Sequence, residues 1–257
     1  MKRTDQGTHA LFVLLVAALA VTAAASWMTG RGEAAPSFPL LATHWGQTGV
    51  YARFTPGNER AGCWSTALAQ ILYYHRLQPS GSVSYRCSDG TVVSENVGAQ
   101  AFNWNLFVND INATTSEPAA DEVARYIYYV SVVIEKDFGT GDYVLAHSDR
   151  ARALSRYFDC RAKLYTNESS SMGQIVNVIK AELDAGRPVM MHLRDRARSN
   201  FHAVAVDGYR STGGNLEVHV NMGHEGEGDG WYLFGGTIGG YDDNSYRRVM
   251  TVARGGG

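Results

Sequence analysis

The chain has 257 residues, of which 45% are hydrophobic and 19% are charged. A disordered protein has too little apolar surface to offset its chain entropy, so this composition excludes disorder and suits one large domain or two small ones. Lys and Arg number 23 against 25 Asp and Glu. This near-neutral balance argues against a nucleic-acid-binding protein, which needs a basic surface.

The first 25 residues have the three-part pattern of a secretory signal peptide. Two basic residues follow the first methionine, residues 10–25 form an apolar run, and the alanines at its end suit cleavage. An uncleaved signal anchor is the alternative, although a membrane span needs about 20 apolar residues. Both interpretations place the rest of the chain outside the cytoplasm.

The chain therefore divides into a signal peptide (1–25), a linker (26–38) and a domain (39–257). We expect the protein to be secreted or extracytoplasmic, and to be held at the membrane only if the N-terminal segment is not cleaved. Disulfides are permitted there, so Cys87 and Cys160 are a candidate pair, although nothing in the local sequence brings them together.

Four segments of the domain have helical periodicity. The strongest covers 63–76, where apolar residues recur at helical spacing directly after Gly62, a residue that allows a sharp turn. Three more helices are predicted over 117–136, 147–158 and 171–185. Most of the helical residues therefore lie in the first part of the domain.

The apolar period changes from 3.6 to 2 at residue 187, which is typical of strands. Five strands are predicted in this part, over 187–194, 201–210, 215–221, 230–234 and 246–253, and two short ones earlier, over 83–86 and 91–93. Helices followed by antiparallel strands indicate an α+β fold. We expect one domain with a helical lobe, a β lobe and a cleft between them.

Cys63 is the first residue of the strongest helix. The helix dipole and the free N–H groups there stabilise a thiolate, so we expect the pKa of Cys63 to fall below about 8.5. A nucleophile is one interpretation; a small buried core residue, which most free cysteines are, is the other. His202 follows roughly 140 residues later, and a Cys-to-His separation of about 130–150 residues is found in papain-like peptidases.

Several segments are similar to one protein family. The segment AGCWSTALAQILYYHR (61–76) resembles the nucleophile helix of the streptopain-like cysteine peptidases, the bacterial C10 family, whose motif reads TGCVATAMAQIMxYH. FHAVAVDGYR (201–210) is similar to the segment around the catalytic histidine of that family, and HVNMGHEGEGDGWYLF (219–234) to HVNWGWGGxxDGYYxL. HWGQTGVY (44–51) and DFGTG (137–141) are similar to two shorter family segments.

The resemblance implies a papain-like fold and a cysteine peptidase that needs neither metal nor cofactor. Cys63 would attack the scissile carbonyl, and His202 would form an ion pair with the thiolate and act as acid and base. The backbone N–H of Cys63 and the side chain of Gln47 would form the oxyanion hole, and Asn221 would support His202. The residues expected to contact the substrate are Phe201, Met222 and Gly139.

The chain departs from the family motif after Asn221, where Met222 and His224 replace two tryptophans. Because those indoles shield the imidazole, we expect the ring of His202 to be less covered here and the enzyme to be weaker. Three carboxylates in the loop 225–229 could bind a cation, but a solvated turn is the commoner role of acidic residues spaced by glycine.

Two alternatives accompany the prediction of a secreted cysteine endopeptidase acting on proteins or peptides. A thiol acyltransferase or amidase on the same fold would share the first chemical step, and only product analysis separates it. A catalytically weak or inactive binding protein would fit the altered residues 222 and 224, although not the intact Cys63 and His202. No pro-segment fits between residue 26 and the first motif, so we expect either a separate inhibitor protein or an enzyme that needs no restraint.

Overall fold

Helices come first and most strands last along the chain, as predicted. The computed structural model describes residues 39–99 and 101–255, so the predicted signal peptide and linker lie outside the described residues, and the domain boundaries stay predictions. The elements, in order, are η1 (Gly49–Ala52), η2 (Pro56–Asn58), α1 (Cys63–Tyr74), β1 (Val83–Arg86), β2 (Val92–Glu95), α2 (Glu117–Val133), α3 (His147–Tyr157), β3 (Cys160–Thr166), α4 (Met172–Asp184), β4 (Val189–Arg194), β5 (Phe201–Thr212), β6 (Asn215–Asn221), β7 (Gly230–Leu233) and β8 (Arg248–Arg254).

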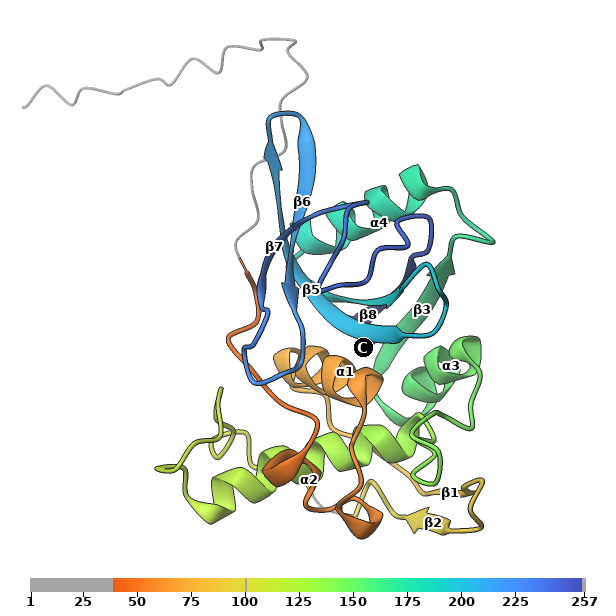
Figure 1. The fold of residues 1–257 in the computed structure, drawn as a ribbon. Helices are drawn as coiled ribbons and strands as arrows, with labels where there is room; N and C mark the ends of the chain where they lie inside the picture. Colours follow the sequence, from red (N-terminus) through yellow and green to blue (C-terminus); the bar gives the residue numbers. More distant parts are fainter. Residues whose placement is uncertain (1–38, 100, 256–257) are drawn as a thin grey trace, which may run out of the picture. The chain divides into compact units, whose positions relative to one another are not determined.

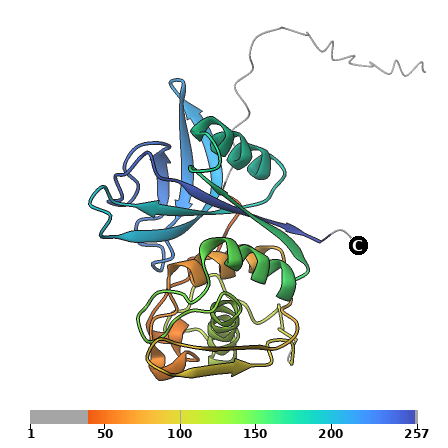
Figure 2. The same ribbon diagram turned by 90° about the vertical axis from the view of Figure 1, so that its right-hand side faces the viewer.

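The β lobe is one antiparallel sheet of six strands in the order β3-β8-β4-β5-β6-β7. Helix α4 covers one face of this sheet, while α1 and α3 lie against the other (Figure 1). Figure 2 shows the same layers from the side, with the sheet above α1, α2 and α3. The predicted α+β class, with a helical N-terminal lobe and an antiparallel β C-terminal lobe, is confirmed.

Each face of the sheet has its own hydrophobic core, which follows from the alternation of side chains along a strand. On β5, Ala203 and Ala205 pack toward α1, whereas Val204 and Val206 pack toward α4. The small alanines let helix α1 approach the sheet closely, and this brings the start of α1 next to the start of β5.

Helix α1 is buried on all sides, from Trp64 to Tyr73, because it lies between α2 and the sheet. Gly62 leads into it with a φ of 92°, a left-handed conformation that favours glycine. A Cβ at this position would lie 2.6 Å from the hydroxyl of Tyr143. Only glycine therefore fits where the chain turns into Cys63.

Two predictions about element boundaries need correction. The helix predicted to end near Lys136 ends at Val133, because the backbone turns into a left-handed conformation at Glu135. Strand β3 was also not predicted, although Cys160, Ala162 and Leu164 alternate with polar residues along this edge strand and pack against the core. Within residues 39–99 and 101–255, no helix is both long and apolar enough to cross a membrane.

Candidate active site

Cys63 and His202 lie where α1 meets β5. The sulfur of Cys63 accepts a hydrogen bond from the backbone N–H of Ala203, the residue directly after His202. The backbone N–H groups of Trp64 and of Cys63 itself also face this sulfur, since both belong to the first turn of α1. The structure thus brings together two residues that are far apart in the sequence.

The protonation of this pair differs from the sequence prediction. Burial raises the pKa of the Cys63 thiol, and this effect outweighs the backbone hydrogen bonds and the charge of Arg60, which lower it. Burial also lowers the pKa of His202 to about 4, and the neighbouring His224 contributes to the shift. Burial thus shifts the pKa of the thiol in the direction opposite to the predicted one and favours a neutral imidazole, whereas the ion pair between Cys63 and His202 stays a prediction.

The imidazole of His202 is fixed in one tautomer. Its Nε2 lies 2.9 Å from the carbonyl oxygen of Met222. A carbonyl oxygen only accepts hydrogen bonds, so Nε2 carries the proton and Nδ1 has a free lone pair. The ring therefore presents a proton acceptor without further rearrangement.

The same ring is covered on two sides by other rings. His224 stacks on it with centroids 4.8 Å apart, and Tyr241 with centroids 5.4 Å apart, both nearly parallel to it. His202 is only 2% exposed as a result. The expected exposure of the imidazole after loss of the tryptophans is contradicted, because His224 and Tyr241 supply the cover.

Met222 does not line the pocket described below, and its contact with substrate stays a prediction. Its side chain is 4% exposed and belongs to the core beneath α4. Its methyl carbon lies so close to Gly239 that a Cβ at that glycine would come within 2.3 Å. The bond to His202 is made by the backbone carbonyl of Met222, so this bond does not depend on which side chain stands at position 222.

Asn221 bonds to groups other than His202. Its amide nitrogen donates to the carbonyl of Thr43 at 2.6 Å, and its oxygen accepts from Gln70 Nε2 at 2.9 Å and from the N–H of Gly223 at 3.0 Å. Gln70 is fully buried on α1. Direct support of the imidazole by Asn221 is therefore not seen; instead the side chain joins α1 to the loop that carries the carbonyl of Met222.

Gln47 is buried close to Cys63 and is held at both ends of its amide. Its oxygen accepts from Arg60 Nε at 2.9 Å, and its nitrogen donates to the carbonyl of Gly223 at 3.1 Å. An amide nitrogen carries two hydrogens, so one remains for an oxyanion. The oxyanion role of Gln47 stays a prediction. Arg60, three residues before Cys63, is a residue of the site that was not predicted from the sequence.

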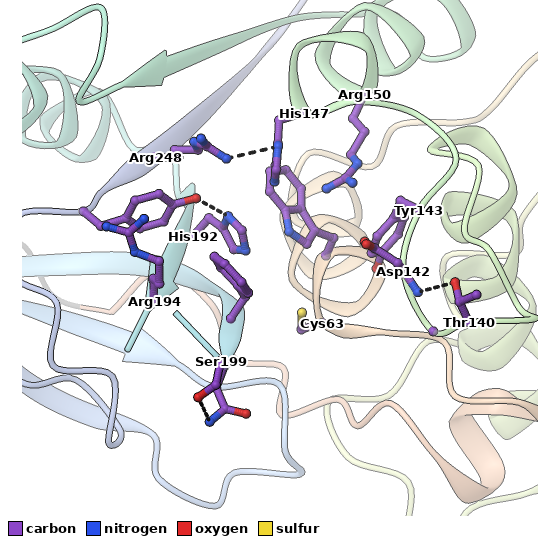
Figure 3. A pocket seen from close by; sticks show the side chains of 15 residues that line it. Cys63, Thr140, Asp142, Tyr143, His147, Arg150, His192, Arg194, Ser199 and Arg248 are labelled. Atoms are coloured by element: carbon purple, nitrogen blue, oxygen red, sulfur yellow. Dashed lines mark hydrogen bonds between the residues drawn. The ribbon is translucent and has the colours of Figure 1, made fainter. Parts of the chain in front are cut away.

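A pocket of about 620 Å³ adjoins Cys63 on the side of α3, β4 and β8 (Figure 3). Phe201 lines it, in line with its predicted contact with substrate, and is 49% exposed. Gly139 does not line it, because it packs against Asp89, where a Cβ would come within 2.8 Å of that side chain. Its neighbours Thr140 and Gly141 form that wall instead.

The carboxylates and the remaining thiols have structural surroundings. Asp229 accepts from the N–H of Met222 at 2.7 Å and lies 2.9 Å from His44, so this acidic residue orders the loop. In the described parts of the chain, no three His, Cys, Asp or Glu side chains gather in a way that could hold a metal ion. Cys87 and Cys160 are separate buried thiols rather than the candidate disulfide, directed at the carbonyls of Lys136 and Leu154.

Comparisons with known proteins identify the family of the chain. The model of the Peptidase C10 family matches residues 45–232. Streptopain of Streptococcus pyogenes serotype M28 is 24% identical in an alignment of 206 residues that covers 72% of this chain and 50% of that protein. The chain thus spans about half the length of the curated relatives that it matches.

Two solved structures share the fold. The active wild-type interpain A cysteine protease of Prevotella intermedia matches with a TM-score of 0.75 and 26% identity, over 85% of this chain and 95% of that one. A prointerpain A fragment from the same organism, carrying a Cys-to-Ala mutation, matches with a TM-score of 0.70 and 25% identity, over 85% and 72%. The resemblance inferred from the sequence is confirmed: the chain belongs to the Peptidase C10 family of cysteine proteases.

Proposed function

We propose that this protein is a secreted or extracytoplasmic cysteine endopeptidase that cleaves proteins through Cys63 and His202. One observation carries the proposal. The sulfur of Cys63 is bonded to the N–H of Ala203, next to a histidine whose Nε2 is occupied by the carbonyl of Met222. The Nδ1 atom of His202 is thus a free base, and it lies beside the thiol of Cys63 at the start of α1. Nucleophilic catalysis by a thiol needs this arrangement.

The reaction begins from the neutral pair. As the substrate carbonyl meets Cys63, the proton of the thiol moves to Nδ1 of His202, and the sulfur forms a bond to the carbonyl carbon. The negative charge on the carbonyl oxygen is stabilised by the N–H of Cys63 and by the free hydrogen on Nε2 of Gln47. His202 then gives its proton to the leaving amine, and water hydrolyses the thioester through the same base.

The surrounding bonds support this scheme by fixing its parts. Arg60 holds the oxygen of Gln47, so that the amide presents nitrogen rather than oxygen. Asn221 and Gln70 hold the loop whose carbonyl fixes the tautomer of His202. Catalytic groups gain most from partners of this kind, since small displacements cost large factors in rate.

The decisive experiment compares the wild-type protein with Cys63→Ala and with Cys160→Ala, a matched removal of a buried thiol outside the site. Hydrolysis of a denatured fluorescent protein and labelling by a peptide electrophile that reacts with thiols are measured together. We expect both to vanish in Cys63→Ala, and the wild-type rates to persist in Cys160→Ala. Hydrolysis that survives in Cys63→Ala would place the chemistry elsewhere.

The two alternatives predicted from the sequence are separated by the same preparation. The raised thiol pKa favours a catalytically weak protein, which would label slowly and hydrolyse little. An acyltransferase would attach an added amine to the acyl group, which mass analysis of the products detects. Secretion is tested by cell fractionation and by sequencing the N-terminus of the mature chain, and a separate inhibitor protein by loss of hydrolysis when it is added.

A further inference from the structure

The pocket beside Cys63 is lined by more positive than negative side chains. Arg150, Arg194 and Arg248 line it, together with one acidic residue, Asp142 (Figure 3). Arg194 forms an ion pair with Asp243, and Arg248 forms one with Glu168 at 3.2 Å. These two arginines are therefore largely neutralised by the chain itself.

Arg150 differs from the other two arginines. Its Nε donates to the carbonyl of Leu145 at 3.0 Å, but within residues 39–99 and 101–255 its two terminal nitrogens have no hydrogen-bond or ion-pair partner. The residue is only 4% exposed. The charge of Asp142 acts on Arg150, but no carboxylate is bonded to it in the described residues. A buried cation without a bonded carboxylate costs free energy, so a ligand that supplies one is stabilised there.

Two aromatic rings hold the guanidinium of Arg150 in place. It lies 4.6 Å from the ring centre of Trp64 and 4.3 Å from that of Tyr143. Trp64 directly follows Cys63 on α1, so this cation lies near the sulfur and its position is fixed. A fixed guanidinium offers paired donors that match both oxygens of a carboxylate.

Asp142 is the group that could occupy Arg150 instead of a ligand. Its side chain is exposed to solvent, and it forms no ion pair with Arg150 in the described part of the chain. Its backbone carbonyl is bonded to Lys136, so the loop is held by the main chain rather than by this carboxylate. Asp142 therefore leaves Arg150 open to a carboxylate from another molecule.

The pocket and the imidazole of His202 lie on opposite sides of the start of strand β5. Phe201 and His202 are neighbours on one strand, so their side chains point to opposite faces. The imidazole protonates the leaving amine, so the leaving part of a peptide lies on its side. The pocket that Phe201 lines then faces the acyl part, which is the part N-terminal to the cleaved bond.

We propose that this pocket selects substrates with a glutamate or aspartate side chain on the N-terminal side of the cleaved bond, and that Arg150 binds the carboxylate. The inference rests on the proposed peptidase function. Trp64 and Phe201 contact the aliphatic part of that side chain, and Arg150 contacts its end. Hydrogen bonds between charged groups are strong enough to give about tenfold or greater discrimination against the neutral amide.

The test uses a series of blocked peptides in which glutamate or glutamine occupies, in turn, each of three positions before the cleaved bond. Binding is measured with the Cys63→Ala protein, where no bond is broken, and hydrolysis with the intact thiol. At one position we expect the glutamate peptide to bind, and to be cleaved, about tenfold or more better than its glutamine partner. Equal binding of every pair would overturn the inference, whether or not the protein is a peptidase.

Arg150→Gln is compared with Arg156→Gln, the same change at an exposed position of the same helix. We expect the glutamate preference to be lost in Arg150→Gln and kept in Arg156→Gln, and we expect Arg156→Gln to cleave the glutamine peptide at the wild-type rate. A preference that survives in Arg150→Gln would assign it to another residue and overturn the inference.

Urea unfolding shows whether Arg150→Gln is folded, and if it is not, Arg150→Lys replaces it. The lysine keeps the charge but loses the paired donors, so a reduced preference is expected and an unchanged one contradicts the proposal. Failure of the wild-type protein to hydrolyse any peptide would overturn the proposed function alone, since the pocket is still judged by binding to Cys63→Ala.

Discussion

The two sides of Cys63 differ in how far their polar groups are already bonded within the chain. On the side of His202, the imidazole, Asn221 and Gln70 all have partners inside the protein. On the side of the pocket, the two terminal nitrogens of Arg150 have no hydrogen-bond partner among the residues that the structure describes. A network of hydrogen bonds within the protein fixes the positions of its atoms, as catalysis needs. Hydrogen-bond donors without a partner in the protein are instead typical of a binding site whose ligand is absent.

Acid is expected to have the largest effect, a loss of folding stability, because buried neutral imidazoles lie on both sides of Cys63. Burial lowers the pKa of His202 and of His147 to about 4 and that of His192 to about 2. Their pKa values in the unfolded chain are near 6.5, so the unfolded state binds more protons as the pH falls below that value. Stability is therefore complete above about pH 6.5 and is lost progressively toward pH 4.

His202 alone contributes about 2 kcal/mol to the loss between pH 7 and pH 4.5. Urea unfolding at pH 7 and at pH 4.5 measures this loss of the free energy of unfolding. Most carboxylates stay ionised over this pH range. In His202→Asn we expect a smaller difference between the two pH values than in the wild type. Equal stability of the wild-type protein at both would contradict the burial of neutral imidazoles.

Removal of Asn221 tests the bonded side directly. Asn221→Ala leaves Gln70 and the N–H of Gly223 without their partner, and a buried unsatisfied group costs about 1–3 kcal/mol. We expect unfolding at lower urea and a lower kcat, since the loop carrying the carbonyl of Met222 loosens. Asn215→Ala, on the exposed end of the same strand, is the control and should change neither. A stable Asn221→Ala with normal kcat would show that the network is dispensable.

Arg60 gives the smallest expected effect. Its charge lowers the pKa of the Cys63 thiol, and its Nε holds Gln47. Arg60→Gln should shift the alkylation profile of Cys63 to higher pH and reduce kcat by about two- to fivefold, because one partly screened charge has a modest influence. Arg161→Gln, an exposed arginine on β3, is the matched control. Coincident profiles for all three proteins would remove Arg60 from the site.

The sequence predicts the framework of this site well, because the framework depends on local patterns. The apolar period places Cys63 at the first residue of α1, and alternation places His202 on a strand, as the structure shows. The resemblance to the C10 family adds Gln47 and Asn221, which do lie near them.

The parts that the sequence could not predict depend on contacts between distant segments. The cover of His202 comes from Tyr241, 39 residues beyond it in a loop without periodicity. The thiol pKa has the opposite direction from the one that the helix start suggests, since burial is a property of the folded lobes together. Arg150 looks like any surface arginine of an amphipathic helix until Trp64 is placed beside it.

The acceptor that fixes the tautomer of His202 belongs to the main chain. A side-chain acceptor can be deleted by one codon change, but the carbonyl of residue 222 remains whichever amino acid stands there. Any side chain that fills the core beneath α4 is therefore compatible with this hydrogen bond. A methionine at position 222 keeps the tautomer of His202 unchanged. Among relatives, variation at this position is consequently a poor guide to whether a given member has kept its activity.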